Sequence, residues 1–232
     1  MKTAAIKSKT KLLIEIIIVL GIMAGTKAIL DYFEIIASGT IGIWVAIIIS
    51  TLFLKRRNIS WKKLGLSLPK GRKQWLRQIG LGLLAVSSIF LITFFTLFVL
   101  EPFFGLEHAA DATDKFKFFL GKPLIFILYL VVGIWFGAAL GEELLIRGFL
   151  LNHLKKLIGN SKISWALALI IQAVIFGFMH SYQGSRGIVI VGFIALSFGI
   201  FYLVAKRNLF PVIFAHAVFD TLTMVGLYLG ES

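Results

Sequence analysis

Residues 123–151 read PLIFILYLVVGIWFGAALGEELLIRGFLL, an apolar run interrupted near its end by two glutamates and an arginine. About 20 apolar residues are enough for a helix to cross the hydrocarbon core of a bilayer. Similar runs recur along the chain, so we predict an all-α, polytopic transmembrane helix bundle. About seven spans are expected, at residues 12–30, 35–54, 79–100, 123–151, 164–180, 188–205 and 209–229.

The composition agrees with a membrane protein. Of the 232 residues, 59% are hydrophobic and the mean hydropathy is +0.94, whereas soluble domains are about 45–50% apolar. The chain has no cysteine, which excludes disulfides and thiolate chemistry. We expect one membrane-embedded domain over residues 1–232, with the core that bears the motifs at about 123–229.

The positive charge is unevenly placed. The net charge is +13, and alternating the spans puts 18 of the 24 basic residues, and no acid, on one side of the membrane. This set is Lys2, Lys7, Lys9, Lys11, Lys55, Arg56, Arg57, Lys62, Lys63, Lys70, Arg72, Lys73, Arg77, Lys155, Lys156, Lys162, Lys206 and Arg207. The positive-inside rule predicts that this side and the N-terminus are cytoplasmic, in the cell membrane. Orientation and contact with anionic lipid explain the basic excess, so no nucleic-acid partner is expected.

Ionisable residues gather in three short motifs on successive apolar segments. The motifs are Glu142-Glu143-x-x-x-Arg147, Phe176-x-x-x-His180 and His216-x-x-x-Asp220. A charged side chain at the centre of a membrane helix costs about 2.5–3.5 kcal/mol on insertion scales. We therefore predict that the three motifs form one buried site.

Spacing divides the first motif. Glu143 and Arg147 are four residues apart, which favours an ion pair along one helix face. Glu142 points about 100° away from Glu143, so it is the candidate for chemistry. A competing interpretation places all three at a solvated cytoplasmic helix end, because Lys155 and Lys156 follow soon after.

The third motif has the same spacing as that ion pair. His216 and Asp220 are four apart, so the carboxylate can orient the imidazole, or both can touch one ligand.

The depth of His180 conflicts with this site. At about 1.5 Å per residue, Glu142 lies roughly 13 Å from Leu151 and His216 roughly 10 Å from Leu209, both in the cytoplasmic half. His180 lies roughly 24 Å from Ser164, near the outer side. Either the fifth helix starts earlier or tilts, or the expected boundaries are wrong.

Glycines mark one face of the fourth span. Gly133, Gly137 and Gly141 are each four residues apart, and small residues on one helix face allow another helix to approach closely. Close packing is therefore expected where the acidic pair begins.

Four smaller expectations concern the remaining polar residues. The 55–78 loop is expected to lie on the membrane surface as an amphipathic segment, and the aromatic 101–122 loop to anchor in the outer interface. Glu15 is expected to pair with Lys11. His108 and His153 are assigned to loops without a role.

At the three motifs the chain resembles the CPBP family, the CAAX proteases and bacteriocin-processing enzymes also called the Abi family. The resemblance spans residues 142–220. The first 120 residues match only in character and in a basic loop, Trp61-Lys62-Lys63-Leu64-Gly65-Leu66. The resemblance implies an intramembrane endopeptidase that cleaves hydrophobic, lipidated or leader-type peptides, including CAAX processing, with its site open toward the cytoplasm.

The resemblance also implies roles for the motif residues. Glu142 would activate water, His180 would help to hold it, and His216 with Asp220 would bind the oxyanion or a metal. Support of the site would come from Glu143, Arg147 and Phe176. The cofactor stays open between zinc, held by His180, His216, Glu142 and Asp220, and none.

Three alternatives to this function remain. A bacteriocin self-immunity protein of the same family would carry the same motifs. Intramembrane Glu, His and Asp also build the relays of proton-coupled transporters, although no inverted repeat is visible here. A non-catalytic membrane scaffold could retain the motifs for stability.

Overall fold

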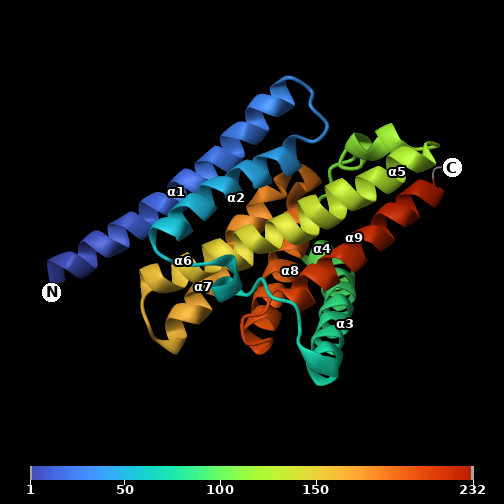
Figure 1. The fold of residues 1–232 in the computed structure, drawn as a ribbon. Coiled ribbons are helices and arrows are strands. Elements are labelled where there is room, and N and C mark those ends of the chain that lie inside the picture. The colour runs from blue at the N-terminus through green and yellow to red at the C-terminus, as the bar shows by residue number, and fades with distance from the viewer. Residues whose placement is uncertain (1, 231–232) are drawn as a thin grey trace.

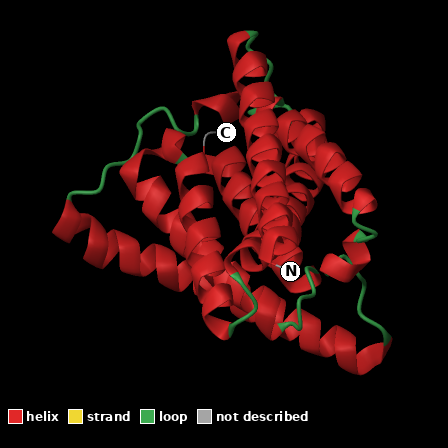
Figure 2. Cartoon of the chain, turned by 90° about the vertical axis from the view of Figure 1, so that its left-hand side faces the viewer, coloured by secondary structure: helices red, strands yellow, loops and turns green. Residues whose placement is uncertain are grey.

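The computed structural model describes residues 2–230, with side chains from residue 8 onward. The side chains of Lys2 and Lys7, which belong to the charge pattern, lie outside these limits. The described residues form helices and connecting loops without a strand (Figures 1 and 2). The main helices are α1 (Lys2–Tyr32), α2 (Ser38–Arg56), α3 (Gly71–Phe95), α5 (Pro123–Tyr129), α6 (Leu151–Ile158), α7 (Lys162–Met179), α8 (Gly184–Val204) and α9 (Phe210–Gly230).

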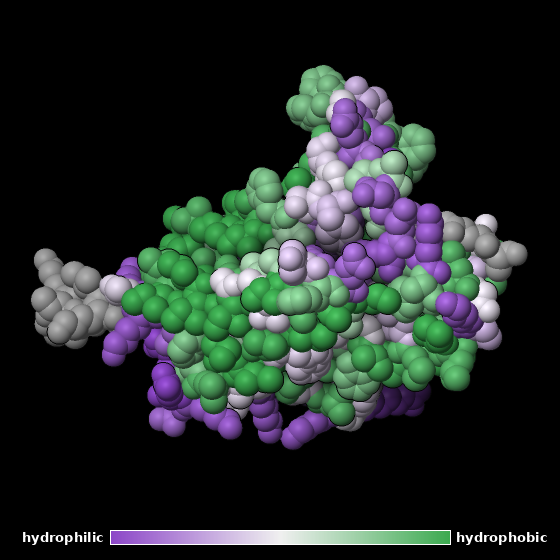
Figure 3. Space-filling view, turned by 90° about the horizontal axis from the view of Figure 1, so that it is seen from above, coloured by the Kyte–Doolittle hydropathy of each residue, from purple (hydrophilic) through white to green (hydrophobic). Residues whose placement is uncertain are grey.

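Seven helical segments of the described chain are long and apolar enough to cross a membrane, which confirms the predicted all-α fold. These segments are Ser8–Tyr32, Ser38–Arg56, Gly71–Phe104, Pro123–Ile158, Lys162–Met179, Ser181–Val204 and Phe210–Gly230. Their outer surfaces are apolar, and Figure 3 shows a broad hydrophobic band with polar residues gathered toward the edges. Exposed apolar side chains are what a lipid-facing surface requires.

The fourth span runs through the middle of the molecule and organises the others. α2 packs against one side of it and α9 against another (Figure 1). A Cβ on Gly137 would lie 2.7 Å from Thr40, and one on Gly141 would lie 2.8 Å from Ile43. These two glycines therefore let α2 approach closely, as predicted. Gly133 instead faces the ring of Tyr129 in its own helix.

The fourth span is also wound more widely than an α-helix. Between α5 and α6 it forms the π-helical segments η4 (Leu130–Glu142) and η5 (Leu144–Leu150). In a π-helix the backbone hydrogen bonds run from residue i to i+5, and such turns are frequent at functional sites. The acidic pair sits at the junction of the two segments, so the local backbone departs from α geometry where the motif begins.

This span continues to Ile158, seven residues beyond the predicted end. His153 was expected in a loop, but it lies inside α6 and is buried. Its Nδ1 lies 2.9 Å from the carbonyl oxygen of Phe149 and its Nε2 lies 3.4 Å from Glu15. The boundary was misplaced because Lys155 and Lys156 end the apolar pattern without ending the helix.

Glu15 has a different partner from the expected Lys11. Its carboxylate accepts hydrogen bonds from Nε of Arg57 at 3.0 and 3.1 Å, and Nη2 of Arg57 lies 2.9 Å away. The pair joins α1 to the end of α2, with His153 of α6 beside it. Glu15 and Arg57 are 42 positions apart. Helix periodicity relates only residues a few positions apart, so it does not predict this contact.

The basic loop after α2 packs partly into the core rather than lying wholly on the surface. Leu64 in the short helix η1 (Trp61–Leu64) is 4% exposed, and its carbonyl accepts a hydrogen bond from Tyr202. The Gly65 carbonyl accepts from the Leu209 backbone at 3.0 Å. Residues 71–78 of the predicted loop form about the first two turns of α3, which begins at Gly71 rather than near residue 79. This loop ties the α8–α9 turn to the fourth span.

Candidate active site

Glu143 and Arg147 form a buried ion pair on the fourth span. Nη1 of Arg147 donates to Oε1 of Glu143 at 2.9 Å, and both side chains are 0% exposed. The pair is not at a solvated helix end, so the competing interpretation of this motif is wrong. A buried ion pair needs further hydrogen bonds to offset the loss of water. Nη2 of Arg147 supplies one by donating to the Ala195 carbonyl at 3.2 Å.

Two aromatic rings enclose the guanidinium. Its central carbon lies 5.1 Å from the ring centre of Phe176 and 5.3 Å from that of Phe198. Cations within about 6 Å of an aromatic face are attracted by the ring quadrupole. Phe176, the first residue of the second motif, therefore touches the arginine of the first motif and links α7 to the fourth span.

The imidazole of His216 joins the third motif to the first. Its Nδ1 lies 3.0 Å from Oε1 of Glu143. The carboxylate oxygen of Glu143 that accepts from Arg147 also accepts here, so Nδ1 is the donor of this hydrogen bond. The other nitrogen, Nε2, then faces the remaining acids. It lies 3.9 Å from Glu142 and 3.4 Å from Asp220.

The four ionisable side chains around this ring differ in how much of their surface is exposed. Glu143 is 0% exposed, whereas His216, Glu142 and Asp220 are 13%, 14% and 26% exposed. Glu143 therefore lies behind His216, and Glu142 and Asp220 lie at its accessible face. A reacting molecule could reach the Nε2 side of the ring and not the Nδ1 side.

His180 lies at the end of α7 and belongs to the same region. Its Nδ1 is 3.0 Å from the Phe176 carbonyl, so that nitrogen is the donor and Nε2 is left free. His216 and Asp220 lie within electrostatic range of the ring. No hydrogen bond or ion pair joins His180 to Glu142, His216 or Asp220 within residues 2–230.

The extended fourth span removes the apparent conflict over the depth of His180. Glu142 precedes Ile158 by 16 residues, and His180 follows Lys162 by 18 residues. At about 1.5 Å per residue these are roughly 24 and 27 Å from the same α6–α7 connection. The two residues therefore lie at similar distances along their helices from that connection, and the earlier count differed because it ended the fourth helix at residue 151.

Three side chains near the site were missed from the sequence. Lys115, Tyr129 and Tyr182 are all in electrostatic range of Glu142. Lys115 lies in the short helix η3 (Asp114–Phe119), with its Nζ 3.5 Å from the ring centre of Tyr182. Its side chain keeps an exposed surface, yet desolvation by neighbouring protein, with Lys27 adding to it, lowers the pKa of Lys115 to about 8.

These residues enter from the end of the bundle opposite the basic loops. From the sequence, loop 101–122 is expected only to anchor in the interface. Lys115 stands among phenylalanines in this loop, and that isolated cation is the feature of the sequence that indicates a role near the site. On the basic side, Asn152 donates a hydrogen bond to the Tyr202 hydroxyl, and that hydroxyl donates to the Leu64 carbonyl. The opening of the site toward the cytoplasm stays a prediction.

The arrangement does not suit a metal ion. Within the described residues no group of three or more His, Asp or Glu side chains is placed to hold one. Glu143 is already engaged by Arg147 and by Nδ1 of His216. No chemical step is therefore assigned to zinc.

A family comparison agrees with the motifs. Residues 123–222 match the model of a family described as type II CAAX prenyl endopeptidase Rce1-like. This match confirms the CPBP family predicted from the three motifs, over a segment that contains all of them. No curated protein and no solved structure matches the chain. The seven spans support a multi-pass membrane protein, and the match over residues 123–222 supports a CAAX-type intramembrane protease in general.

Proposed function

We propose that the chain is an intramembrane endopeptidase that hydrolyses a peptide bond with a water activated by Glu142. The observation that carries the proposal is the convergence of three acids on His216. Glu143 holds one ring nitrogen at 3.0 Å, and Glu142 and Asp220 face the other at 3.9 and 3.4 Å. Peptide hydrolysis needs a base for water and a donor for the oxyanion, and these positions offer both.

The proposed reaction begins with a proton transfer. The Glu142 carboxylate accepts a proton from water while the water oxygen bonds to the carbonyl carbon of the peptide. Nε2 of His216, in its protonated form, donates a hydrogen bond to the resulting oxyanion. Glu142 then passes its proton to the amide nitrogen, the carbon–nitrogen bond breaks, and a carboxylic acid and an amine leave.

The remaining motif residues are proposed to position these groups. Glu143 fixes the ring of His216, and Arg147 holds the carboxylate of Glu143 in place. Asp220 lies 3.4 Å from Nε2 and helps to orient the imidazole. The free Nε2 of His180 is available to accept a hydrogen bond from the attacking water.

Substrates of this site are proposed to be hydrophobic, lipidated or leader-type peptides, such as prenylated C-termini. Glu142, His216 and Asp220 lie within membrane spans, so a scissile bond must reach them from the bilayer or its interface. A bacteriocin-immunity role of the same family would use the same chemistry. A transporter or scaffold would not need Glu142 at the accessible face of His216.

The test uses the full chain reconstituted in liposomes with hydrophobic reporter peptides, including one with a prenylated C-terminus. We expect Glu142→Ala to lower the cleavage rate by about 10²–10⁴-fold, as loss of a general base does. Glu107→Ala, which removes an exposed acid outside the site, is the matched control and should cleave normally. Wild-type cleavage by Glu142→Ala would contradict the proposal, and proton flux without cleavage would favour the transporter.

A further inference from the structure

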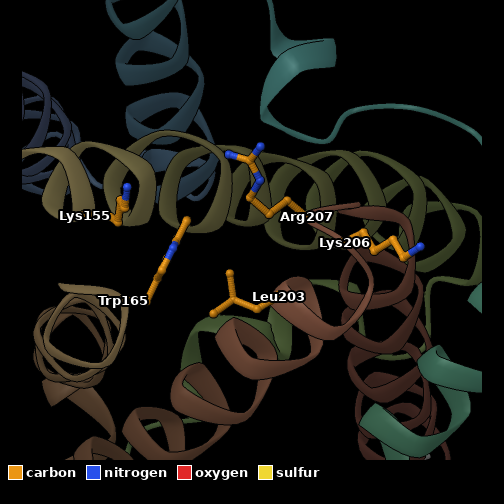
Figure 4. Close-up of a pocket in the computed structure, with 5 residues that line it drawn as sticks. All are labelled: Lys155, Trp165, Leu203, Lys206 and Arg207. Atoms are coloured by element: carbon orange, nitrogen blue, oxygen red, sulfur yellow. The ribbon is translucent and has the colours of Figure 1, made fainter. Parts of the chain in front are cut away.

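A polar hollow lies on the basic side of the bundle, away from the candidate active site. Its volume is about 660 Å³, within the range of small-molecule sites. Figure 4 shows the residues that line it, which are Lys155, Trp165, Leu203, Lys206 and Arg207. We call this feature the basic hollow.

Three separate elements meet at the basic hollow. Lys155 comes from α6, Trp165 from the first turn of α7, and Lys206 and Arg207 from the α8–α9 turn. The indole lies beside Lys155, whose Nζ is 5.6 Å from the ring centre. In Figure 4 Lys155 and Arg207 extend to the same side with Trp165 between them, whereas Lys206 points away.

The turn that presents the arginine is held in an unfavourable backbone conformation. Lys206 and Arg207 have φ angles of 58° and 60°, in the left-handed region that non-glycine residues rarely adopt. Two backbone hydrogen bonds fix the turn, from Lys206 to Leu203 at 3.0 Å and from Arg207 to Tyr202 at 2.8 Å. Strained residues persist where the surroundings over-determine them, and they cluster at ligand sites.

The charge of the hollow is unbalanced. Its lining holds three cations and no acid. Lys155 donates to the neutral oxygen of Asn160 at 3.3 Å, and none of the ion pairs found within residues 8–230 involves a lining cation. An anion entering the hollow would therefore meet positive charge that no carboxylate already neutralises.

The surroundings favour a lipid over a free anion. Ile200 and Val204 on the same helix as Leu203 are 47% and 50% exposed, and Ile163 near Trp165 is 70% exposed. Apolar surface beside the cations gives acyl chains a place to lie once the headgroup is bound. Tryptophan is also typical of the headgroup level of a membrane.

We propose that the basic hollow binds the phosphate of an anionic phospholipid headgroup. Basic pockets between membrane helices on the cytoplasmic side are suited to such headgroups. Arg207 offers several donors in a planar fork that matches phosphate oxygens, and Lys155 adds a second cation across the indole. None of the residues that line the basic hollow belongs to the candidate active site, so lipid binding here does not depend on peptide cleavage.

The test measures lipid binding to the full chain in a neutral detergent micelle, which removes the surface potential of a charged membrane. Native mass spectrometry would be used to count bound short-chain phosphatidylglycerol and to give its dissociation constant. One lipid should bind saturably, and Lys155→Gln with Arg207→Gln should weaken it about 25-fold, or about fivefold for each cation. Phosphatidylcholine of equal chain length should bind at least about tenfold more weakly.

The matched control is Lys62→Gln with Lys73→Gln, which removes two exposed cations outside the hollow. This pair should change the affinity less than about twofold, and all variants should unfold at the wild-type temperature. Equal weakening by the control pair, or unchanged binding in the hollow variant, would overturn the proposal. Displacement of the lipid by an equal concentration of inorganic phosphate would show that the ligand is a free anion rather than a lipid.

Discussion

The guanidinium of Arg147 and the carboxylate of Glu143 are joined at 2.9 Å, with neither side chain exposed. The same carboxylate oxygen lies 3.0 Å from Nδ1 of His216. The ion pair therefore determines the orientation of the ring whose other nitrogen faces Glu142. Of the two adjacent glutamates, one supports the site from behind and the other lies at its accessible face.

Removal of the arginine should destabilise the protein through the charge it leaves behind. Arg147→Met strands Glu143 in a dry interior, and breaking a buried pair costs about 3–5 kcal/mol. Adding Glu143→Gln should recover much of this loss, because the amide oxygen can still accept from His216. Unfolding of both single variants and the double variant in detergent measures the coupling. A double variant as unstable as Arg147→Met alone would contradict the role of the pair.

Asp220 can be tested by changing its charge and its polarity separately. Asp220→Asn keeps a polar group 3.4 Å from His216, and an amide can donate to an oxyanion. We expect kcat/KM within about tenfold of the wild type for this variant, and a loss of about 100-fold for Asp220→Leu, comparable to losing one oxyanion donor. Both values are measured as rates of peptide cleavage. Full activity in Asp220→Leu would remove Asp220 from the site.

Lys115 predicts a pH dependence of substrate binding. Desolvation lowers the pKa of Lys115 to about 8, so its positive charge is present at pH 7 and mostly lost at pH 9. If this cation helps to bind a peptide with a free C-terminal carboxylate, KM should rise severalfold as the pH passes through 8. Lys115→Arg, which stays charged, should abolish the rise, and an amidated peptide should not show it. An identical pH profile in Lys115→Arg would contradict this role.

Chelation should leave the reaction unchanged. No three ligand side chains within residues 2–230 are placed around one point, and Glu143 is committed to Arg147. We expect the cleavage rate after treatment with a strong zinc chelator to equal that of the untreated enzyme. Elemental analysis of the purified protein is the companion measurement. Activity that is lost on chelation and restored by one equivalent of zinc would show that the ligands rearrange around a metal.

Sequence patterns predict the structure correctly where an interaction is local within one helix or where the composition is strongly apolar. Apolar runs of span length predict the seven helices, and the spacing of Glu143 and Arg147 predicts their ion pair. Gly137 and Gly141 likewise indicate the close approach of α2. Each of these inferences depends on residues within one helix, where periodicity fixes the geometry.

Tertiary contacts explain what the sequence patterns missed. The pairing of Glu15 with Arg57 joins different helices, and the burial of His153 follows from a helix that continues through two lysines. The position of Lys115 over Tyr182 depends on how a loop folds back on the bundle. Contacts of this kind arise between distant segments, so no short spacing in the sequence encodes them.

The most direct test compares the two neighbouring glutamates in one experiment. Glu142→Gln and Glu143→Gln remove the same charge one residue apart, and both cleavage rate and unfolding temperature are measured. We predict that Glu142→Gln loses about 10²–10⁴-fold in rate and unfolds at the wild-type temperature, whereas Glu143→Gln unfolds at a lower temperature. Wild-type cleavage by Glu142→Gln, in a protein that remains folded, would contradict the assignment of Glu142 as the base.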